Sequence, residues 1–328
     1  MTARQTLSWR SLAQKRRYAG GMDAVEERLR AVASAYAGSL GEASRSTLAA
    51  GGKRVRPLLT LLSAQRRERF DDAVIRAAAA VELLHMATLV HDDVLDRAEL
   101  RRGRATVAHE FGVETAVSAG NYLLARAFAE LTETGSATAV DILSATAVGL
   151  SEGEVLQRRE AYDVTLGREA YEQRCERKTA DLFAAACDLG ALLSGLDERD
   201  RRALAEYGRL LGLAFQVFDD ILDVSGDESR TGKRLGADVR DGTITLPLIF
   251  ALEARPELAP RLRNGGALDE VAVAAVIAEV RSTGAIERAR EVALASIDEA
   301  WRTLETCSDD VERDLLAEVA RSVVDRFG

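Results

Sequence analysis

Apolar residues recur at helical spacing along most of the chain, whereas strict alternation of apolar and polar residues is hard to find. Apolar positions three to four residues apart predict amphipathic helices. The clearest such stretches are residues 113–131, 139–157, 179–193, 203–224, 271–281 and 286–304. Breaks that each contain glycine interrupt the pattern at residues 51–52, 134–136, 195, 225–226, 232 and 265–266, where we expect loops. The sequence therefore predicts an all-α protein.

The chain of 328 residues has no stretch rich in proline, glycine or serine that would separate two halves. We therefore expect one domain, from residue 22 to residue 328. A basic tail, residues 1–21, precedes it and lacks the apolar run of a secretory signal.

Composition narrows the possible partners and location of the protein. The formal net charge of -9 gives little support for nucleic-acid binding. Cys175, Cys187 and Cys307 show no metal-binding spacing, and an odd number of cysteines fits the reduced cytoplasm better than a disulfide scaffold. No run of about 18 uncharged apolar residues is present, so we expect no transmembrane segment.

Two acidic clusters have matching surroundings. The segments VHDDVLD and VFDDILD end at Asp96 and Asp223, and each follows apolar residues. On a helix, residues four apart share a face, so Asp92 lies beside Asp96 and Asp219 beside Asp223. Three carboxylates on little more than one turn repel each other, and apolar neighbours make unpaired charge more costly.

Most aspartate clusters are solvated or pair with nearby arginines, but the apolar flanks here argue against a plain surface role. All-oxygen ligands suit hard divalent ions, and a pair of carboxylates completed by water and substrate phosphates suits Mg²⁺. The loop spacing of a dedicated calcium site is absent. The two clusters therefore predict Mg²⁺ binding.

Basic residues lie close to these clusters in the sequence. The stretch GGKRVRP, residues 51–57, opens a predicted helix on which Lys53 and Arg56 would share a face. Each basic group alone fits a solvated side chain. Together they fit two phosphorylated substrates, while the phosphate loops of NTPases and dinucleotide-binding enzymes are absent. The further basic groups are Arg101, Arg102, Lys178 and Lys233.

From about residue 30 onward the chain resembles the trans-polyprenyl diphosphate synthases. Six motifs in order carry the resemblance: GGKRVRP (51–57), HMATLVHDDVLD (85–96), RRGRATV (101–107), KTADLFAAAC (178–187), FQVFDDILD (215–223) and GKRLGADVRDGTITLP (232–247). The resemblance implies an isoprenoid synthase type helical bundle around a deep central cavity, usually as a homodimer. It also implies Mg²⁺-dependent head-to-tail condensation of isopentenyl diphosphate with an allylic diphosphate, farnesyl or geranyl diphosphate.

The resemblance implies a role for each residue that matches a family motif. Three Mg²⁺ ions would be held directly by Asp92, Asp96 and Asp219, with Asp93, Asp220, Asp223 and Asp238 as water-mediated ligands or support. The allylic diphosphate would be held by Arg101, Lys178, Thr179, Gln216 and Lys233. Isopentenyl diphosphate would be held by Gly52, Lys53, Arg56, His85 and Arg102. The catalytic set would be Asp92, Asp93, Asp96, Arg101, Lys178, Asp219, Asp220 and Lys233.

Metal ions and cationic side chains would stabilise charge on the departing diphosphate while the double bond of isopentenyl diphosphate attacks the allylic cation.

Two positions depart from the family pattern. Thr243 stands where many relatives have a lysine, and this could loosen one diphosphate contact. Asn121 stands where an aspartate is usual, and we expect a structural effect there.

By the same resemblance, residues just before the first acidic cluster set the length of the product. Short-chain enzymes carry an aromatic residue near Ala87, whereas alanine would leave a tunnel open. Ala87 and Thr88, with Leu84 nearby, therefore predict a long-chain product. Bulky residues deeper in the protein could still close the tunnel, and the candidates for its floor are Leu84, Leu123, Phe128 and Leu143.

Three alternatives stay open. The chain could make a shorter farnesyl or geranylgeranyl product, act as a class I terpene cyclase, or serve as one subunit of a heteromeric synthase. Cyclases usually change the second cluster and lack GGKRVRP, and non-catalytic subunits usually lose aspartates, whereas this chain keeps all six.

Overall fold

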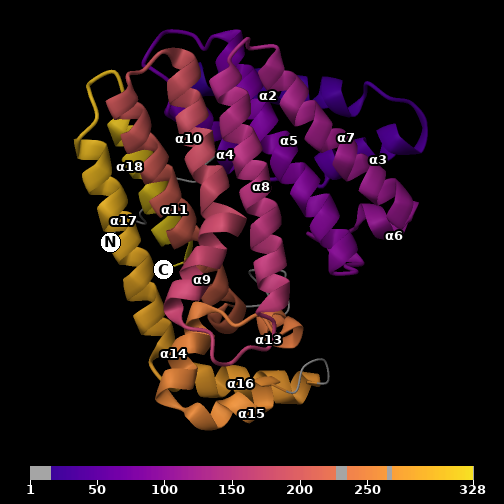
Figure 1. The fold of residues 1–328 in the computed structure, drawn as a ribbon, viewed down its shortest axis with the longest axis vertical. Coiled ribbons are helices and arrows are strands. Elements are labelled where there is room, and N and C mark those ends of the chain that lie inside the picture. Colours follow the sequence, from indigo (N-terminus) through magenta and orange to yellow (C-terminus); the bar gives the residue numbers. More distant parts are fainter. Residues whose placement is uncertain (1–15, 227–234, 264–267, 328) are drawn as a thin grey trace, which may run out of the picture. The chain divides into compact units, whose positions relative to one another are not determined.

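The computed structural model describes residues 16–226, 235–263 and 268–327. This part of the chain is almost entirely helical, which confirms the predicted fold class (Figure 1). The first helices are α2 (Arg16–Ala33), α3 (Gly38–Ala49), α4 (Val55–Leu62), α5 (Asp72–Leu95), α6 (Val107–Phe111), α7 (Val113–Thr132), α8 (Ala137–Arg159) and α9 (Arg168–Cys175). The later helices are α10 (Asp181–Ser194), α11 (Glu198–Ser225), α13 (Ala237–Asp241), α14 (Leu246–Ala254), α15 (Ala259–Arg263), α16 (Glu270–Arg281), α17 (Ala285–Glu305) and α18 (Arg313–Phe327).

The six stretches of helical period all fall on helices, and α7, α8, α16 and α17 match their predicted bounds within two residues. Several helices, such as α2 and α18, lie outside these stretches, and three short elements are not distinguished by the periodicity. They are a hairpin of β1 (Leu100–Arg101) and β2 (Arg104–Ala105), a π-helical segment η1 (Glu176–Ala180), and a 3₁₀ turn η2 (Pro256–Leu258). Each is too short to produce a period that a sequence window can detect.

Contacts between residues divide the chain into two compact units. Of the described residues, unit 1 comprises 16–147, 182–208 and 303–322, and unit 2 comprises 148–181, 209–226, 235–263, 268–302 and 323–327. The boundaries between the units fall inside helices, such as α8 and α11, rather than in linkers. The single domain from residue 22 to residue 328 stays a prediction.

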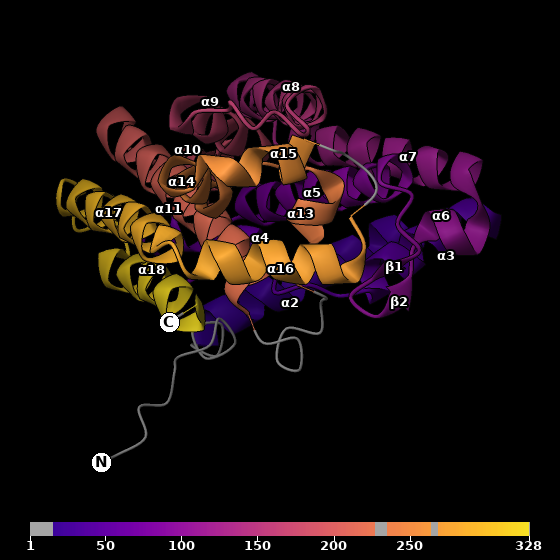
Figure 2. The same cartoon turned by 90° about the horizontal axis from the view of Figure 1, so that it is seen from below.

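Helix α5 is central to unit 1. It packs most extensively against α7 and also contacts α2, α4 and α6, as the two views together show (Figures 1 and 2). A helix that is apolar around most of its circumference is expected to be buried in this way. By length and composition alone α5 could cross a membrane, but most of its apolar window is buried inside the protein.

Helix α10 approaches α4 very closely at Gly190, where an added Cβ would collide with the carbonyl group of Thr60. We expect Gly190→Ala to lower the free energy of unfolding by about 1–3 kcal/mol, because overpacking forces the backbone apart. As a control, Gly20→Ala on α2 meets no atom within 4 Å and should raise stability by about 0.5–1 kcal/mol. Thermal denaturation measures both, and an unchanged Gly190→Ala variant would contradict the close contact.

Within unit 2, α9 runs directly into η1. Helix α14 packs against α9 and α16, and α13 packs against α16, so these short helices form one cluster (Figure 2). The α9–η1 segment carries Lys178 and Thr179, and the unit 2 portion of α11 carries the second acidic cluster. Several of the predicted functional residues therefore lie in unit 2 itself.

Candidate active site

The last turn of α5 carries the first acidic cluster. The Asp96 N–H donates to the carbonyl oxygen of Asp92 at 2.8 Å, so the helical turn extends to Asp96 and the two side chains share a face. Asp93 is buried instead, and its Oδ1 accepts a hydrogen bond from Arg101 Nε at 2.7 Å. Burial raises the pKa of Asp93, and the Arg101 guanidinium opposes that rise. Asp93 thus supports Arg101, whereas Asp92 and Asp96 are more accessible.

The β1–β2 hairpin positions two of the predicted arginines. Arg101 pairs with Arg104 across the hairpin, and Arg102 and Gly103 form its two-residue turn with φ of 53° and 75°. Positive φ at both positions is typical of a type I′ turn. Arg102 Nη1 also donates a hydrogen bond to the carbonyl oxygen of Gly51. This bond connects the hairpin to the glycine loop, residues 51–54, which precedes α4.

The glycine loop ends at Arg54, which adopts a left-handed backbone with φ of 50°. Two ion pairs hold Arg54: its Nε lies 2.6 Å from Glu26 Oε1, and its Nη1 lies 2.7 Å from Glu82 Oε1. Glu82 is buried, so it neutralises Arg54 inside the protein. Since α4 begins only after Arg54, Lys53 precedes the helix, and the expected shared helical face of Lys53 and Arg56 is wrong.

Arg56 lies on the first turn of α4, with its guanidinium 4.8 Å from the centre of the Phe183 ring. Burial lowers the pKa of Arg56 to about 10, and the carboxylate of Glu82 opposes that shift. Within the described residues, the buried Nε of Arg56 has no hydrogen-bond partner. An unpaired buried donor is costly, and an anionic ligand would satisfy it.

His85 faces the same group of arginines. Burial lowers its pKa well below the usual value, and the charges of Arg56 and Arg102 lower it further. The imidazole is therefore neutral near pH 7. A neutral imidazole offers one hydrogen-bond donor and one acceptor, so His85 can contact a ligand without adding charge.

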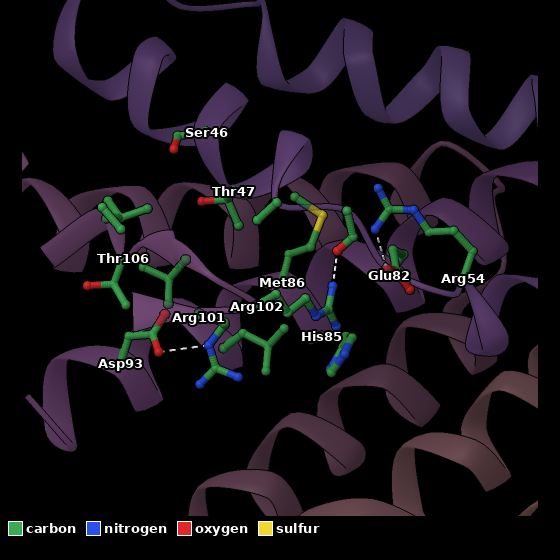
Figure 3. A pocket seen from close by; sticks show the side chains of 16 residues that line it. Ser46, Thr47, Arg54, Glu82, His85, Met86, Asp93, Arg101, Arg102 and Thr106 are labelled. Atoms are coloured by element: carbon green, nitrogen blue, oxygen red, sulfur yellow. Dashed lines mark hydrogen bonds and ion pairs between the residues drawn. The ribbon is translucent and has the colours of Figure 1, made fainter. Parts of the chain in front are cut away.

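A pocket in unit 1, partly open to solvent, is lined by Arg54, His85, Arg101 and Arg102, whereas Arg56 and Lys53 are not part of its lining. Figure 3 shows Arg101 paired with Asp93 on one side and Arg54 paired with Glu82 on the other, with His85 and Arg102 between them. The lining therefore brings His85 and Arg102 of the predicted isopentenyl diphosphate set together with Arg101 of the predicted allylic set. A concave site lined by several cations and one neutral imidazole suits an anion such as a diphosphate.

The second acidic cluster lies on α11 in unit 2. Asp220 is buried, and both of its carboxylate oxygens are used: Oδ2 accepts from Tyr171 Oη at 2.6 Å, and Oδ1 accepts from Gln216 Nε2 at 2.8 Å. Burial raises the pKa of Asp220 to about 7, and these two hydrogen bonds oppose the rise. The middle aspartate is therefore held by protein donors in both clusters, whereas Asp219 is half-buried. The sequence offered no motif that would have identified Tyr171.

We expect Tyr171→Phe to lower the free energy of unfolding by about 1.5–3 kcal/mol, because it removes a buried hydrogen bond to a carboxylate. Thermal or urea denaturation measures the change. Tyr36→Phe is a suitable control, because Tyr36 is 56% exposed and its replacement should change stability by less than about 0.5 kcal/mol. Equal stability of the two variants would contradict the Tyr171–Asp220 bond.

Asp223 caps the start of α13. Its Oδ1 accepts from the Ala237 N–H at 3.0 Å, and its Oδ2 accepts from the Asp238 N–H at 3.1 Å. Burial raises the pKa of Asp238 well above the usual value, and the nearby carboxylates of Asp220 and Asp223 add to this. Asp238 therefore lies beside the second cluster, and its predicted role in supporting Mg²⁺ stays a prediction.

The predicted allylic residues of unit 2 lie on η1 and α11. Thr179 Oγ1 donates to Gln216 Oε1 at 2.7 Å, so these two predicted residues are in direct contact. Lys178 Nζ lies 2.7 Å from Glu154 Oε2 on α8. Lys233 lies outside the described residues.

The donor set decides whether the residues fit a magnesium ion. Across the described ranges, no three Asp, Glu, His or Cys side chains converge as a group that could hold a metal by itself. The first cluster instead offers Asp92 and Asp96, four residues apart at the end of α5, and the second offers Asp219, because both carboxylate oxygens of Asp223 accept backbone N–H groups. Mg²⁺ commonly binds through one or two carboxylates, with water and substrate phosphates completing its octahedron. The residues therefore fit Mg²⁺ that is bound together with a diphosphate.

The predicted chain-length residues lie on α5. Ala87 and Leu84 are buried, and the Thr88 hydroxyl donates a hydrogen bond to the carbonyl oxygen of His85 at 2.8 Å.

Of the two departures from the family pattern, Asn121 is exposed on α7. The Thr243 N–H donates to the carbonyl oxygen of Asp238 at 2.8 Å.

Comparison with known proteins identifies the family to which this arrangement belongs. Residues 38–280 match the family described as Polyprenyl synthetase. The chain is 40% identical over 298 residues to heptaprenyl diphosphate synthase component 2 of Geobacillus stearothermophilus, covering 90% of this chain and 93% of the relative. It is 36% identical over 283 residues to octaprenyl diphosphate synthase of Escherichia coli, covering 84% and 86%.

A solved structure gives the same result for the fold. The crystal structure of a decaprenyl diphosphate synthase from Rhodobacter capsulatus is similar with a TM-score of 0.90 and 34% identity, covering 98% of this chain and 99% of that one. The chain belongs to the polyprenyl synthetase family and is a prenyltransferase.

Proposed function

We propose that this enzyme condenses isopentenyl diphosphate head-to-tail with an allylic diphosphate and makes a long-chain trans-polyprenyl diphosphate. The observation that supports this most is the matched arrangement of the two acidic clusters. In each, the middle aspartate is fixed by protein donors, and Asp92 and Asp96 in the first cluster and the half-buried Asp219 in the second would bind the metal–diphosphate complex. Relatives named heptaprenyl, octaprenyl and nonaprenyl diphosphate synthase support the long product.

When bound, Mg²⁺ would neutralise charge that develops on the leaving diphosphate. Asp92, Asp96 and Asp219 would hold Mg²⁺ directly, and the family resemblance implies three such ions. The pocket of unit 1 would hold isopentenyl diphosphate through His85 and Arg102. The proposed roles of Gly52, Lys53 and Arg56 in holding the same ligand rest on their motif. The proposed roles of Lys178, Thr179 and Gln216 in holding the allylic diphosphate rest on their motif.

The reaction would take place in the cytoplasm, with a homodimer as the working assembly. A specific observation favours a second candidate for the assembly. Two relatives, from Geobacillus stearothermophilus and Bacillus subtilis, are named component 2 of heptaprenyl diphosphate synthase. The chain could therefore require a second, different subunit.

The test is incubation of the purified protein with Mg²⁺, radiolabelled isopentenyl diphosphate and farnesyl diphosphate, followed by sizing of the products. We expect a ladder that ends at a long prenyl diphosphate. Product that forms only after a partner subunit is added would favour the heteromeric assembly. A cyclic hydrocarbon without isopentenyl label would refute the proposal in favour of a terpene cyclase.

A further inference from the structure

Lys178 lies in an unusual part of the backbone. The segment η1, Glu176–Ala180, is π-helical and joins α9 to α10. A π-turn carries an extra residue and shifts the side chains that follow it, and such turns are frequent at functional sites. Here Thr179 contacts Gln216 on α11, while Lys178 reaches Glu154 on α8. The π-turn thus directs two neighbouring side chains to two different helices of unit 2.

Glycines on α8 allow this contact. A Cβ at Gly153 would lie 2.7 Å from the backbone nitrogen of Lys178, and a Cβ at Gly149 would lie 2.7 Å from Asp181 Oδ2. Because residues four apart share a helical face, the two glycines form one strip on which η1 lies. A larger residue at Gly153 would push the two backbones apart. The close approach brings Glu154, the residue after Gly153, within reach of Lys178.

Glu154 is held between two cations. Its Oε2 lies 2.7 Å from Lys178 Nζ, and its Oε1 lies 2.9 Å from Arg158 Nε. The Glu154 side chain is 15% exposed and that of Lys178 is 28% exposed. Burial alone would raise the pKa of Glu154, but the charges of Lys178 and Arg158 hold it below its usual value. The group of three keeps one net positive charge, so it still attracts an anion.

We propose that Glu154 is a positioning residue for Lys178 and, through it, for the allylic diphosphate. An ammonium group has three N–H donors. Glu154 accepts one of them and fixes the flexible stem, which leaves two donors for diphosphate oxygens. This inference rests on the proposed function, because that function assigns Lys178 to the allylic diphosphate.

The test replaces Glu154 by glutamine, which keeps the shape of the side chain and removes its charge. We expect the KM for farnesyl diphosphate to rise about tenfold, while the KM for isopentenyl diphosphate changes less than twofold. Glu152→Gln is the matched control, since Glu152 lies on the same helix, is 57% exposed and is 3.7 Å from Arg177 Nε. It should leave both values unchanged. An equal rise of both KM values in Glu154→Gln would overturn the proposal.

A double-mutant cycle asks whether Glu154 acts through Lys178. In a Lys178→Ala background, Glu154→Gln should have no further effect on the KM for farnesyl diphosphate. A full tenfold effect in that background would overturn the proposal.

A third readout needs no substrate. The chain has only four lysines, Lys15, Lys53, Lys178 and Lys233, so mass spectrometry can follow each after treatment with acetic anhydride. Because the carboxylate covers and immobilises the ammonium group, we expect acetylation of Lys178 to be several times faster in Glu154→Gln, with Lys15 unchanged. An unchanged rate at Lys178 would overturn the inference even in an active enzyme. If the wild type failed to condense the substrates, the proposed function would fail while this contact remained testable.

Discussion

Replacement of Asp92 by asparagine is expected to reduce kcat/KM by about a thousandfold, because the substitution removes a full negative charge that would hold Mg²⁺ on the reacting diphosphate. Asparagine has nearly the same size, so the helix α5 should remain intact. Steady-state kinetics with farnesyl and isopentenyl diphosphates measure the loss. The defect should be partly relieved by raising Mg²⁺, because the remaining ligands still bind the ion more weakly.

Two comparison variants separate this effect from a general loss of charge. Asp141→Asn changes an exposed aspartate on α8 and should leave kcat/KM unchanged. Asp93→Asn breaks the 2.7 Å pair with Arg101, so its main effect should be on the KM for the allylic diphosphate that Arg101 is proposed to bind. If Asp92→Asn kept kcat/KM within threefold of the wild type, Asp92 would not be a metal ligand.

The sequence predicted several long helices and the shared helical face of Asp92 and Asp96, for a physical reason. Helices such as α7 and α17 have an apolar face that repeats along many residues, so local spacing is enough to identify them. Asp92 and Asp96 could be placed on one face because they are separated by one helical turn. In both cases the relevant partners are close in the sequence.

Contacts between residues on different helices could not be predicted from the sequence. Arg54 takes a left-handed backbone, which separates Lys53 from the helix, and it does so while paired with Glu26 and Glu82 from other helices. Tyr171 meets Asp220 across 49 residues of sequence. Such contacts depend on how helices pack, and no spacing rule within one helix contains that information.

Ala87→Phe is expected to shorten the product. The measurement tests whether Ala87 faces an open tunnel. Ala87 is 1% exposed and lies on α5, little more than one turn before Asp92. In a filled core, a phenylalanine here would cost about 1–3 kcal/mol through overpacking. In a tunnel, the ring would occupy empty space and block the growing chain. The two cases give opposite results, because only a filled core lowers the melting temperature and leaves product length unchanged.

A second position on the same face makes the test quantitative. Ala80 is also fully buried, and it lies seven residues before Ala87, which is two helical turns or about 10 Å along the helix axis. If the tunnel runs along α5 away from the acidic cluster, Ala80→Phe should stop the chain later than Ala87→Phe does. Products of both variants, sized beside the wild type, should therefore increase in length in the order Ala87→Phe, Ala80→Phe, wild type. Equal product length in all three would mean that another surface sets the length, because a wall that includes α5 must respond to a ring placed on it.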